Sequence, residues 1–97
     1  MNHTAIYKYP LGDMSSLRPV HWVDLPQGAQ IPSAQVQREE AVVWALVDPK
    51  AALVVRSIRV LVTGEPCELP PGAKFIATLQ FAEGGFVVHL FDLGERA

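Results

Sequence analysis

The chain contains two segments of equal length that read as copies of one unit. Residues 25–48 read LPQGAQIPSAQVQREEAVVWALVD and residues 69–92 read LPPGAKFIATLQFAEGGFVVHLFD, and the two align over 24 residues without a gap. Both copies open with Leu-Pro-x-Gly-Ala and both end in Asp, so the matches lie at both ends of the unit. An internal repeat indicates that one small supersecondary unit is used twice, which narrows the folds that the chain can adopt.

Each copy is typical of a β-hairpin. The opening Pro-x-Gly predicts a turn, because proline pre-sets φ and glycine accepts positive φ. A run of about eight residues, a polar turn and an apolar run follow. In the first copy the apolar alternation slips by one residue, which predicts a β-bulge near Ile31 and Pro32 and places the proline at a sheet edge. In the second copy the alternation places Phe75, Ala77, Leu79 and Phe81 on one face and Ile76 on the other.

The remaining segments also read as strands. Residues 6–9 form a short apolar run that we expect to end at Pro10, and residues 20–24 and 56–63 form two more. Residues 48–56 can be read as the start of a helix or as a turn, and the β-branched residues that follow favour the turn.

These elements together predict the fold class. We expect a single all-β domain over residues 1–97, with about seven short strands arranged as a small sandwich or a rolled antiparallel sheet. Two of its parts are the related hairpin units over residues 25–48 and 69–92.

The closing strands of the two copies, 41–47 and 86–93, are apolar on both faces. Continuous apolar strands are covered on both sides in folded proteins. The cover can come from a second sheet, a short helix or a second copy of the protein, and monomers rarely leave a large apolar patch exposed. We therefore predict a homodimer, with a self-covered sandwich of the two hairpins as the alternative.

Composition excludes several classes of function. The chain has 97 residues, a net charge of −2 and no run of basic residues, so we expect no direct binding to nucleic acid. Cys67 is the only cysteine, which rules out an internal disulfide and a cysteine-based metal cage. No signal peptide or apolar run of membrane-spanning length is visible, so we expect no membrane association and a cytoplasmic protein in the bacterial host cell.

The sequence offers no catalytic constellation. The three histidines share no metal-binding spacing, and Cys67 has no neighbouring base. Asp48 and Asp92 occupy equivalent positions in the two copies, where an acid–base pair is the sharper hypothesis and an Asx-turn the ordinary one, which we favour. We therefore predict that the protein is not an enzyme and uses no cofactor and no metal.

Four residues are candidates for binding a partner. Trp22 lies beside His21 on a short strand with polar neighbours, and aromatic residues anchor interfaces because they bury a large area. Arg56 and Arg59 interrupt an apolar strand and can present guanidinium groups to a carboxylate or a phosphate.

Several motifs resemble those of a small, uncharacterised phage-protein family whose members run WKYPL, MPKGA, VQVQ, WALVDP, GTG and FHxFE. The matching segments of this chain are Tyr7-Lys8-Tyr9-Pro10-Leu11, Leu25-Pro26-Gln27-Gly28-Ala29, Val36-Gln37, Trp44-Ala45-Leu46-Val47-Asp48-Pro49, Thr63-Gly64 and Phe86-Val87-Val88-His89-Leu90-Phe91. The chain departs from the family in having Tyr7 where Trp is usual, Asp92 where Glu is frequent, and a longer segment at 13–19.

The resemblance implies a phage or prophage gene expressed in a bacterium. By analogy with small phage proteins, we expect a non-enzymatic accessory protein that binds and sterically inhibits a bacterial host protein, such as a CRISPR or other anti-phage defence effector. An anti-CRISPR protein is one example of this class. Two alternatives stay open: a sponge that binds a signalling nucleotide through Arg56, Arg59 and aromatic residues, and a minor virion or assembly protein.

Overall fold

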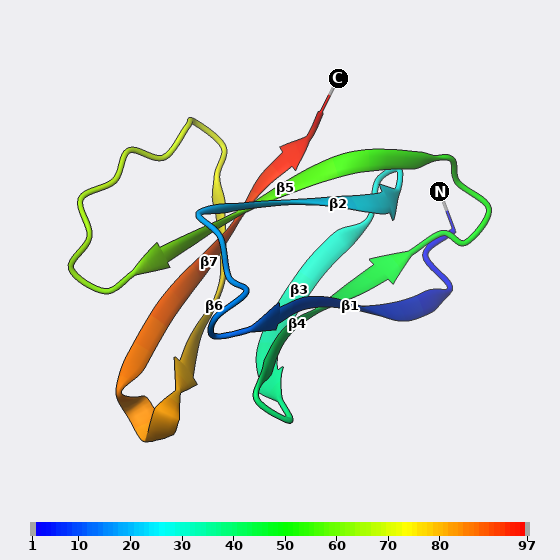
Figure 1. Cartoon of the computed structure of the whole chain (residues 1–97). Coiled ribbons are helices and arrows are strands. Elements are labelled where there is room, and N and C mark those ends of the chain that lie inside the picture. The colour runs from blue at the N-terminus through cyan, green and yellow to red at the C-terminus, as the bar shows by residue number, and fades with distance from the viewer. Residues whose placement is uncertain (1, 97) are drawn as a thin grey trace.

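The computed structural model describes residues 2–96 and consists almost entirely of β-strands (Figure 1). The elements are β1 (Ala5–Asp13), β2 (Val20–Pro26), β3 (Gln30–Gln37), β4 (Glu40–Val47), β5 (Leu53–Val62), β6 (Lys74–Phe81), the short 3₁₀ turn η1 (Ala82–Gly84) and β7 (Phe86–Glu95). The predicted all-β fold is confirmed.

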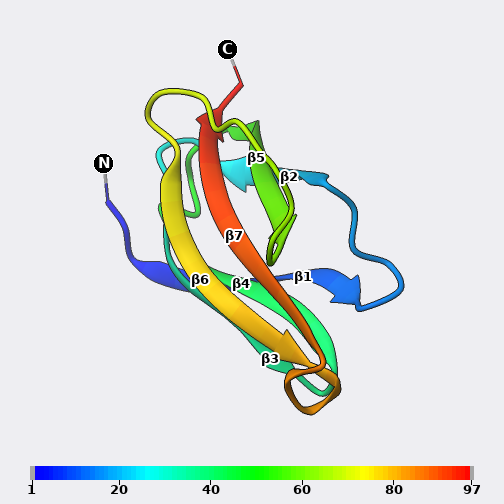
Figure 2. The same cartoon turned by 90° about the vertical axis from the view of Figure 1, so that its left-hand side faces the viewer.

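The strands form two antiparallel sheets. One has three strands in the order β1-β4-β3, and the other has four strands in the order β2-β5-β7-β6. The edge strands β3 and β6 contact each other, and Figure 2 shows the β6–β7 pair in front of β3 and β4. The arrangement is sandwich-like, with the inner faces of the two sheets turned toward each other.

The core lies between the sheets. Its largest cluster joins residues of five strands: Leu11, Ala41, Val43, Ile58, Val60, Ile76, Leu79, Phe81, Val88 and Leu90. A smaller cluster surrounds Leu25, which is fully buried, at the turn between β2 and β3. Removing this apolar surface from water is the main force that holds the two sheets together.

The two repeat copies both form antiparallel hairpins, β3–β4 and β6–β7. Their opening turns make the same hydrogen bond: the N–H of Ala29 donates to Pro26 O at 3.1 Å, and that of Ala73 donates to Pro70 O at 3.2 Å. Their closing loops differ in length. The first is a tight turn at residues 38–39, and the second spans residues 82–85.

Both hairpins contain a bulge in their first strand. The bulge predicted in the first copy is confirmed, because the register of β3 against β4 shifts between Gln30 and Ser33. The second copy has a matching shift between Phe75 and Ala77, which the sequence did not reveal. The expectation that Phe75 shares the core face and that Ile76 faces away was wrong, because this bulge leaves Phe75 58% exposed and places Ile76 in the core.

The end of β1 differs from expectation, whereas the turn expected after β4 is found. β1 continues through Pro10 to Asp13, and a bulge between Pro10 and Gly12 accommodates the proline at this sheet edge. At residues 48–52 the turn reading is confirmed, because the N–H of Ala51 donates to Asp48 O at 3.0 Å and no helix forms.

The central strand β7 shows how the continuous apolar runs are used. Val88 and Leu90 point inward and are fully buried, whereas Val87, His89 and Phe91 alternate onto the outer face of the four-stranded sheet. The inner faces thus cover each other within one chain. The predicted homodimer remains a prediction, and it now concerns the outer faces only.

Candidate functional site

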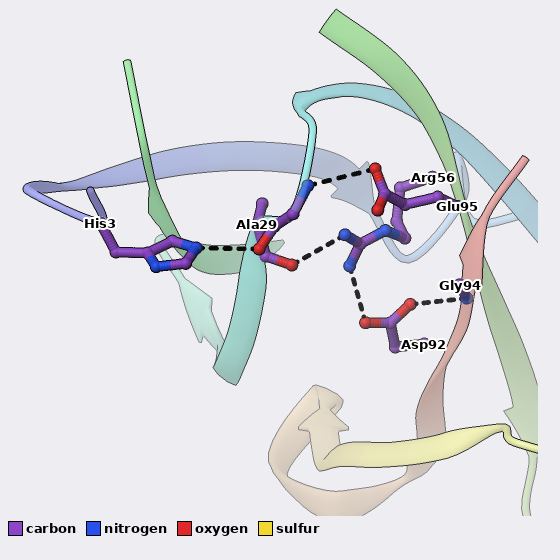
Figure 3. A network of polar contacts seen from close by, with 7 residues as sticks. His3, Ala29, Arg56, Asp92, Gly94 and Glu95 are labelled. Carbon is purple, nitrogen blue, oxygen red and sulfur yellow. Dashed lines mark hydrogen bonds and ion pairs between the residues drawn. The ribbon is translucent and has the colours of Figure 1, made fainter. Parts of the chain in front are cut away.

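A buried arginine joins two strands to the turn that opens the first hairpin (Figure 3). Arg56 belongs to β5 and is 4% exposed. Its Nη1 donates to Asp92 Oδ2 at 2.9 Å, and its Nη2 donates to the backbone oxygen of Ala29 at 2.7 Å. One side chain therefore connects β5, β7 and the turn before β3.

The carboxylate of Asp92 is fully engaged. Its second oxygen, Oδ1, accepts a hydrogen bond from the N–H of Gly94 at 2.8 Å. The equivalent Asp48 accepts from the N–H of Lys50 at 3.0 Å, with the same two-residue spacing. The Asx-turn interpretation holds for both aspartates, and the buried ion pair of Asp92 is an addition that the repeat did not predict.

The network continues on the other side of the same turn. The ring Nε2 of His3 donates to Gly28 O at 2.9 Å, and the N–H of Gly28 donates to Glu95 Oε2 at 3.2 Å (Figure 3). Gly28 has a φ of 80°, a conformation that favours glycine. The backbone of Gly28 is thus hydrogen-bonded to His3, near the start of the chain, and to Glu95, near its end.

A hollow of about 670 Å³ lies beside this network. Its walls come from the opening turns of both repeat copies, so that Gly28 and Gly72, and likewise Gln30 and Lys74, are equivalent residues on its two sides. Phe75 also lines it. The volume lies within the range of roughly 300–1,000 Å³ that is usual for small-molecule sites.

A second surface is formed by the outer side of the four-stranded sheet. We call it the aromatic face and define it as Trp22, Arg59, Phe75, Phe91 and Arg96. Strand register places Arg59, Phe91 and Phe75 next to one another across β5, β7 and β6, and Trp22, on β2, opposite Ser57. Arg96 follows the end of β7. Trp22 and Phe75 are each 58% exposed.

Contacts within the aromatic face keep its rings in place. The rings of Phe75 and Phe91 pack edge to face with centroids 5.5 Å apart. The guanidinium of Arg96 lies 4.8 Å from the centre of the Trp22 ring, within the range of a cation–π contact. Half-exposed aromatic rings held in this way are suited to docking, because little side-chain entropy is left to lose.

The four predicted binding residues fall on opposite faces of the sheet. Trp22 and Arg59 lie on the aromatic face, where Arg59 Nη1 donates to Pro19 O at 3.0 Å. His21 and Arg56 point to the inner side instead. Their spacing already carried this signal, because residues an odd number of positions apart point to opposite sides of a strand.

His21 gives the structure a dependence on pH. Its Nε2 accepts a hydrogen bond from the N–H of Arg18 at 3.1 Å, and burial, followed by the charge of Arg18, lowers the pKa of the imidazole. The unfolded chain binds a proton near the ordinary pKa of about 6.5, before the folded chain does. Stability is therefore full above that pH and falls as the pH drops from about 6.5 toward the lower folded pKa.

We predict that His21→Gln reduces this loss of stability. Urea unfolding at about pH 7.5 and about pH 5.5 measures it, as the difference in midpoint between the two conditions. The difference should be smaller in the variant than in the unmodified protein. Equal differences in both proteins would show that His21 does not contribute.

His89 is the other histidine inside a strand, and both of its ring nitrogens form hydrogen bonds with threonine hydroxyl groups. Its Nε2 lies 2.7 Å from Thr63 Oγ1 and its Nδ1 lies 2.9 Å from Thr78 Oγ1. Across residues 2–96, no three histidine, cysteine, aspartate or glutamate side chains are grouped so that they could hold a metal ion. Cys67 is exposed on the loop before β6.

Acidic side chains gather at the opposite end of the molecule, where the two hairpins close. Glu39 and Glu83, which match in the repeat, line a hollow of about 570 Å³ together with Asp13. Hydrogen bonds from Ser15 and then Ser16 lower the pKa of Asp13. These hydrogen bonds stabilise the turn after β1, so the role of Asp13 is explained by the turn and requires no ligand.

Comparison with known proteins places the chain in one family. A family described as a domain of unknown function, DUF7352, matches residues 2–97, so the chain belongs to this family. No curated protein and no solved structure gives a match. Within the described residues, no helix has the length and apolarity needed to cross a membrane.

Proposed function

We propose that this protein is a non-enzymatic, phage-encoded binding protein that attaches to a bacterial host protein and inhibits it sterically. The observation that carries the proposal is the aromatic face, where Trp22 and Phe75 are exposed and Arg59 and Arg96 lie among them. Interface cores are enriched in aromatic residues and arginine. Large exposed apolar patches in monomers mark interaction sites.

The biological setting in this proposal rests on the sequence motifs that resemble the phage-protein family. We propose that the protein acts in the cytoplasm of the bacterial host and that its target there is a CRISPR or other anti-phage defence effector. Steric inhibition is the mechanism that fits a small domain with a docking face. A role in virion assembly would use the same kind of face and would differ in the protein that is captured.

The test compares capture of host proteins by variants of the aromatic face. Trp22→Ala should reduce the captured partner by about tenfold or more, because interface tryptophans contribute about 2 kcal/mol or more on truncation. Affinity purification from a phage-sensitive bacterium, followed by quantitative mass spectrometry, measures the partner. Ile6→Ala is the matched control, since Ile6 is 66% exposed on the other sheet.

A partner retained by Ile6→Ala and lost by Trp22→Ala supports the proposal. If the two variants retain the same proteins in the same amounts, the aromatic face is not the docking site. Capture of virion proteins alone would replace the inhibitor by an assembly factor.

The hollow beside the Arg56 network favours a second candidate function. A nucleotide sponge needs a concave site with a cation and an aromatic ring, and the hollow is lined by Lys74, Phe75 and Arg56. This candidate shares Phe75 with the aromatic face but does not involve Trp22.

A further inference from the structure

We infer that the hollow between the two opening turns binds a small planar molecule that carries a phosphate or carboxylate group, the chemistry of a mononucleotide. Lys74 meets the anionic group and Phe75 stacks on the planar group. The inference rests on the second candidate function and gives its ligand a chemical class.

The hydrogen-bonding groups that line the hollow indicate what kind of ligand it can bind. Four acceptors in its wall are occupied: both oxygens of Asp92 are bonded, Glu95 Oε2 accepts from the N–H of Gly28, and Ala29 O accepts from Arg56. A donor is left over, because the buried Nε–H of Arg56 has no partner among the described residues. That N–H is closed off from solvent, so Lys74 supplies the side-chain cation that a ligand in the hollow can reach, and its ammonium donors favour a ligand with acceptor oxygens.

The charges point the same way. The hollow is lined by two cations, Arg56 and Lys74, and by two carboxylates. Arg56 and Asp92 form the one ion pair found among residues 2–96, and Glu95 is bonded to backbone. Lys74 lies opposite Asp92 in the strand register but makes no ion pair with it. Lys74 and Glu95 are therefore the two charges of the hollow without an ion-pair partner in the described part of the chain, and the Lys74 ammonium group is the one that can meet an anion.

Phe75 supplies the platform for a planar group. The unpredicted bulge in β6 turns it out of the core, and its ring contacts Phe91 with an interplanar angle of 69°. An edge-to-face contact of this kind leaves ring surface open, in agreement with the 58% exposure. Bases stack on such exposed rings in nucleotide-binding proteins.

The walls of the hollow are fixed before any ligand arrives. Arg56, Asp92 and Glu95 tie the first opening turn to β5 and β7, so the site loses little conformational entropy on binding. Gly72 and Gly94, which also line the hollow, have no atom within 4 Å of the position that a Cβ would take. Free space therefore remains between the fixed walls.

The experiment titrates the full chain with adenosine monophosphate, adenosine and inorganic phosphate, using heteronuclear NMR shifts and calorimetry. Adenosine monophosphate should bind and shift the amide signals of Lys74, Phe75 and Gly28. Adenosine and phosphate should each bind at least about tenfold more weakly, because each lacks one of the two contacts. A short single-stranded oligonucleotide distinguishes a free nucleotide from a nucleotide within a chain.

Two variants and a control complete the test. Lys74→Gln should weaken binding of adenosine monophosphate by about tenfold, as loss of a charge-assisted hydrogen bond does. Phe75→Leu should weaken it by a similar factor through lost stacking. Lys50→Gln, at an exposed lysine on the turn before β5, should leave it unchanged.

No binding at millimolar concentration overturns the inference. So does equal binding of adenosine and adenosine monophosphate, or equal affinity of the Lys74→Gln and Lys50→Gln variants. None of these results changes the outcome of the Trp22→Ala capture experiment, because Trp22 does not line the hollow. The inference and the proposed docking function can therefore fail separately.

Discussion

Asp92→Asn should lower the free energy of unfolding by about 3 kcal/mol, because it leaves the Arg56 guanidinium buried without its counter-charge. The side chains of the two partners are 5% and 12% exposed, so water cannot replace the lost carboxylate. The amide oxygen of the asparagine can still accept from the N–H of Gly94, but its NH2 group then faces Arg56 Nη1, so the hydrogen bond of the pair is lost together with the charge. Urea unfolding monitored by Trp fluorescence gives the value directly.

The converse substitution should be at least as damaging. Arg56→Met removes the counter-charge of Asp92 and the donor to Ala29 O together, and we expect a loss of about 3–5 kcal/mol. Small domains are stable by only about 5–15 kcal/mol, so this variant should be partly unfolded at growth temperature. The double variant Arg56→Met/Asp92→Leu should be more stable than either single variant, since it leaves no unpaired charge.

Arg59 provides the matched control. It lies on the same strand, three residues away, but within residues 2–96 it makes no ion pair, and it donates to two backbone oxygens. Arg59→Met should change stability by less than about 1 kcal/mol. If Asp92→Asn proves as mild as Arg59→Met, the buried pair contributes nothing to stability.

The contrast between these two arginines shows what sequence patterns can and cannot establish. Arg56 and Arg59 look alike in an apolar strand, and their odd spacing indicates only that they point to opposite sides. Which side is the inner one depends on the neighbouring strands, and β5 pairs with β2 and β7, which are far apart in sequence. The ion pair of Arg56 with Asp92 therefore could not be read from local pattern.

Sequence patterns predicted structure more successfully where only neighbouring residues determine the conformation. Proline and glycine marked both opening turns, and the slipped alternation revealed the bulge at Ile31 and Pro32. The equivalent bulge near Phe75 left no such trace, because Ile76 and Phe75 are both apolar and either one satisfies an inward position. The hollow escaped prediction for the same reason, since it depends on where Phe75 points.

Val43→Glu should abolish folding. Val43 lies in the middle of the central strand β4, is fully buried and packs in the core between the two sheets. A carboxylate there has no cation to pair with, and burying an unpaired charge costs more than about 4–5 kcal/mol, which approaches the whole stability of a small domain. Far-ultraviolet circular dichroism should show loss of the β spectrum. A native spectrum would contradict the assignment of this face to the core.

Val87→Glu places the same charge on the outer face of β7, where the side chain is only partly buried, and the fold should survive. The two variants therefore distinguish a strand face that is covered by the other sheet of the same chain from one that is covered by a second copy of the protein. If a second copy covers the outer face, light scattering at micromolar concentration should give twice 10.6 kDa for the unmodified protein and 10.6 kDa for folded Val87→Glu. A mass of 10.6 kDa for both would rule out the homodimer and leave the outer face free for another partner.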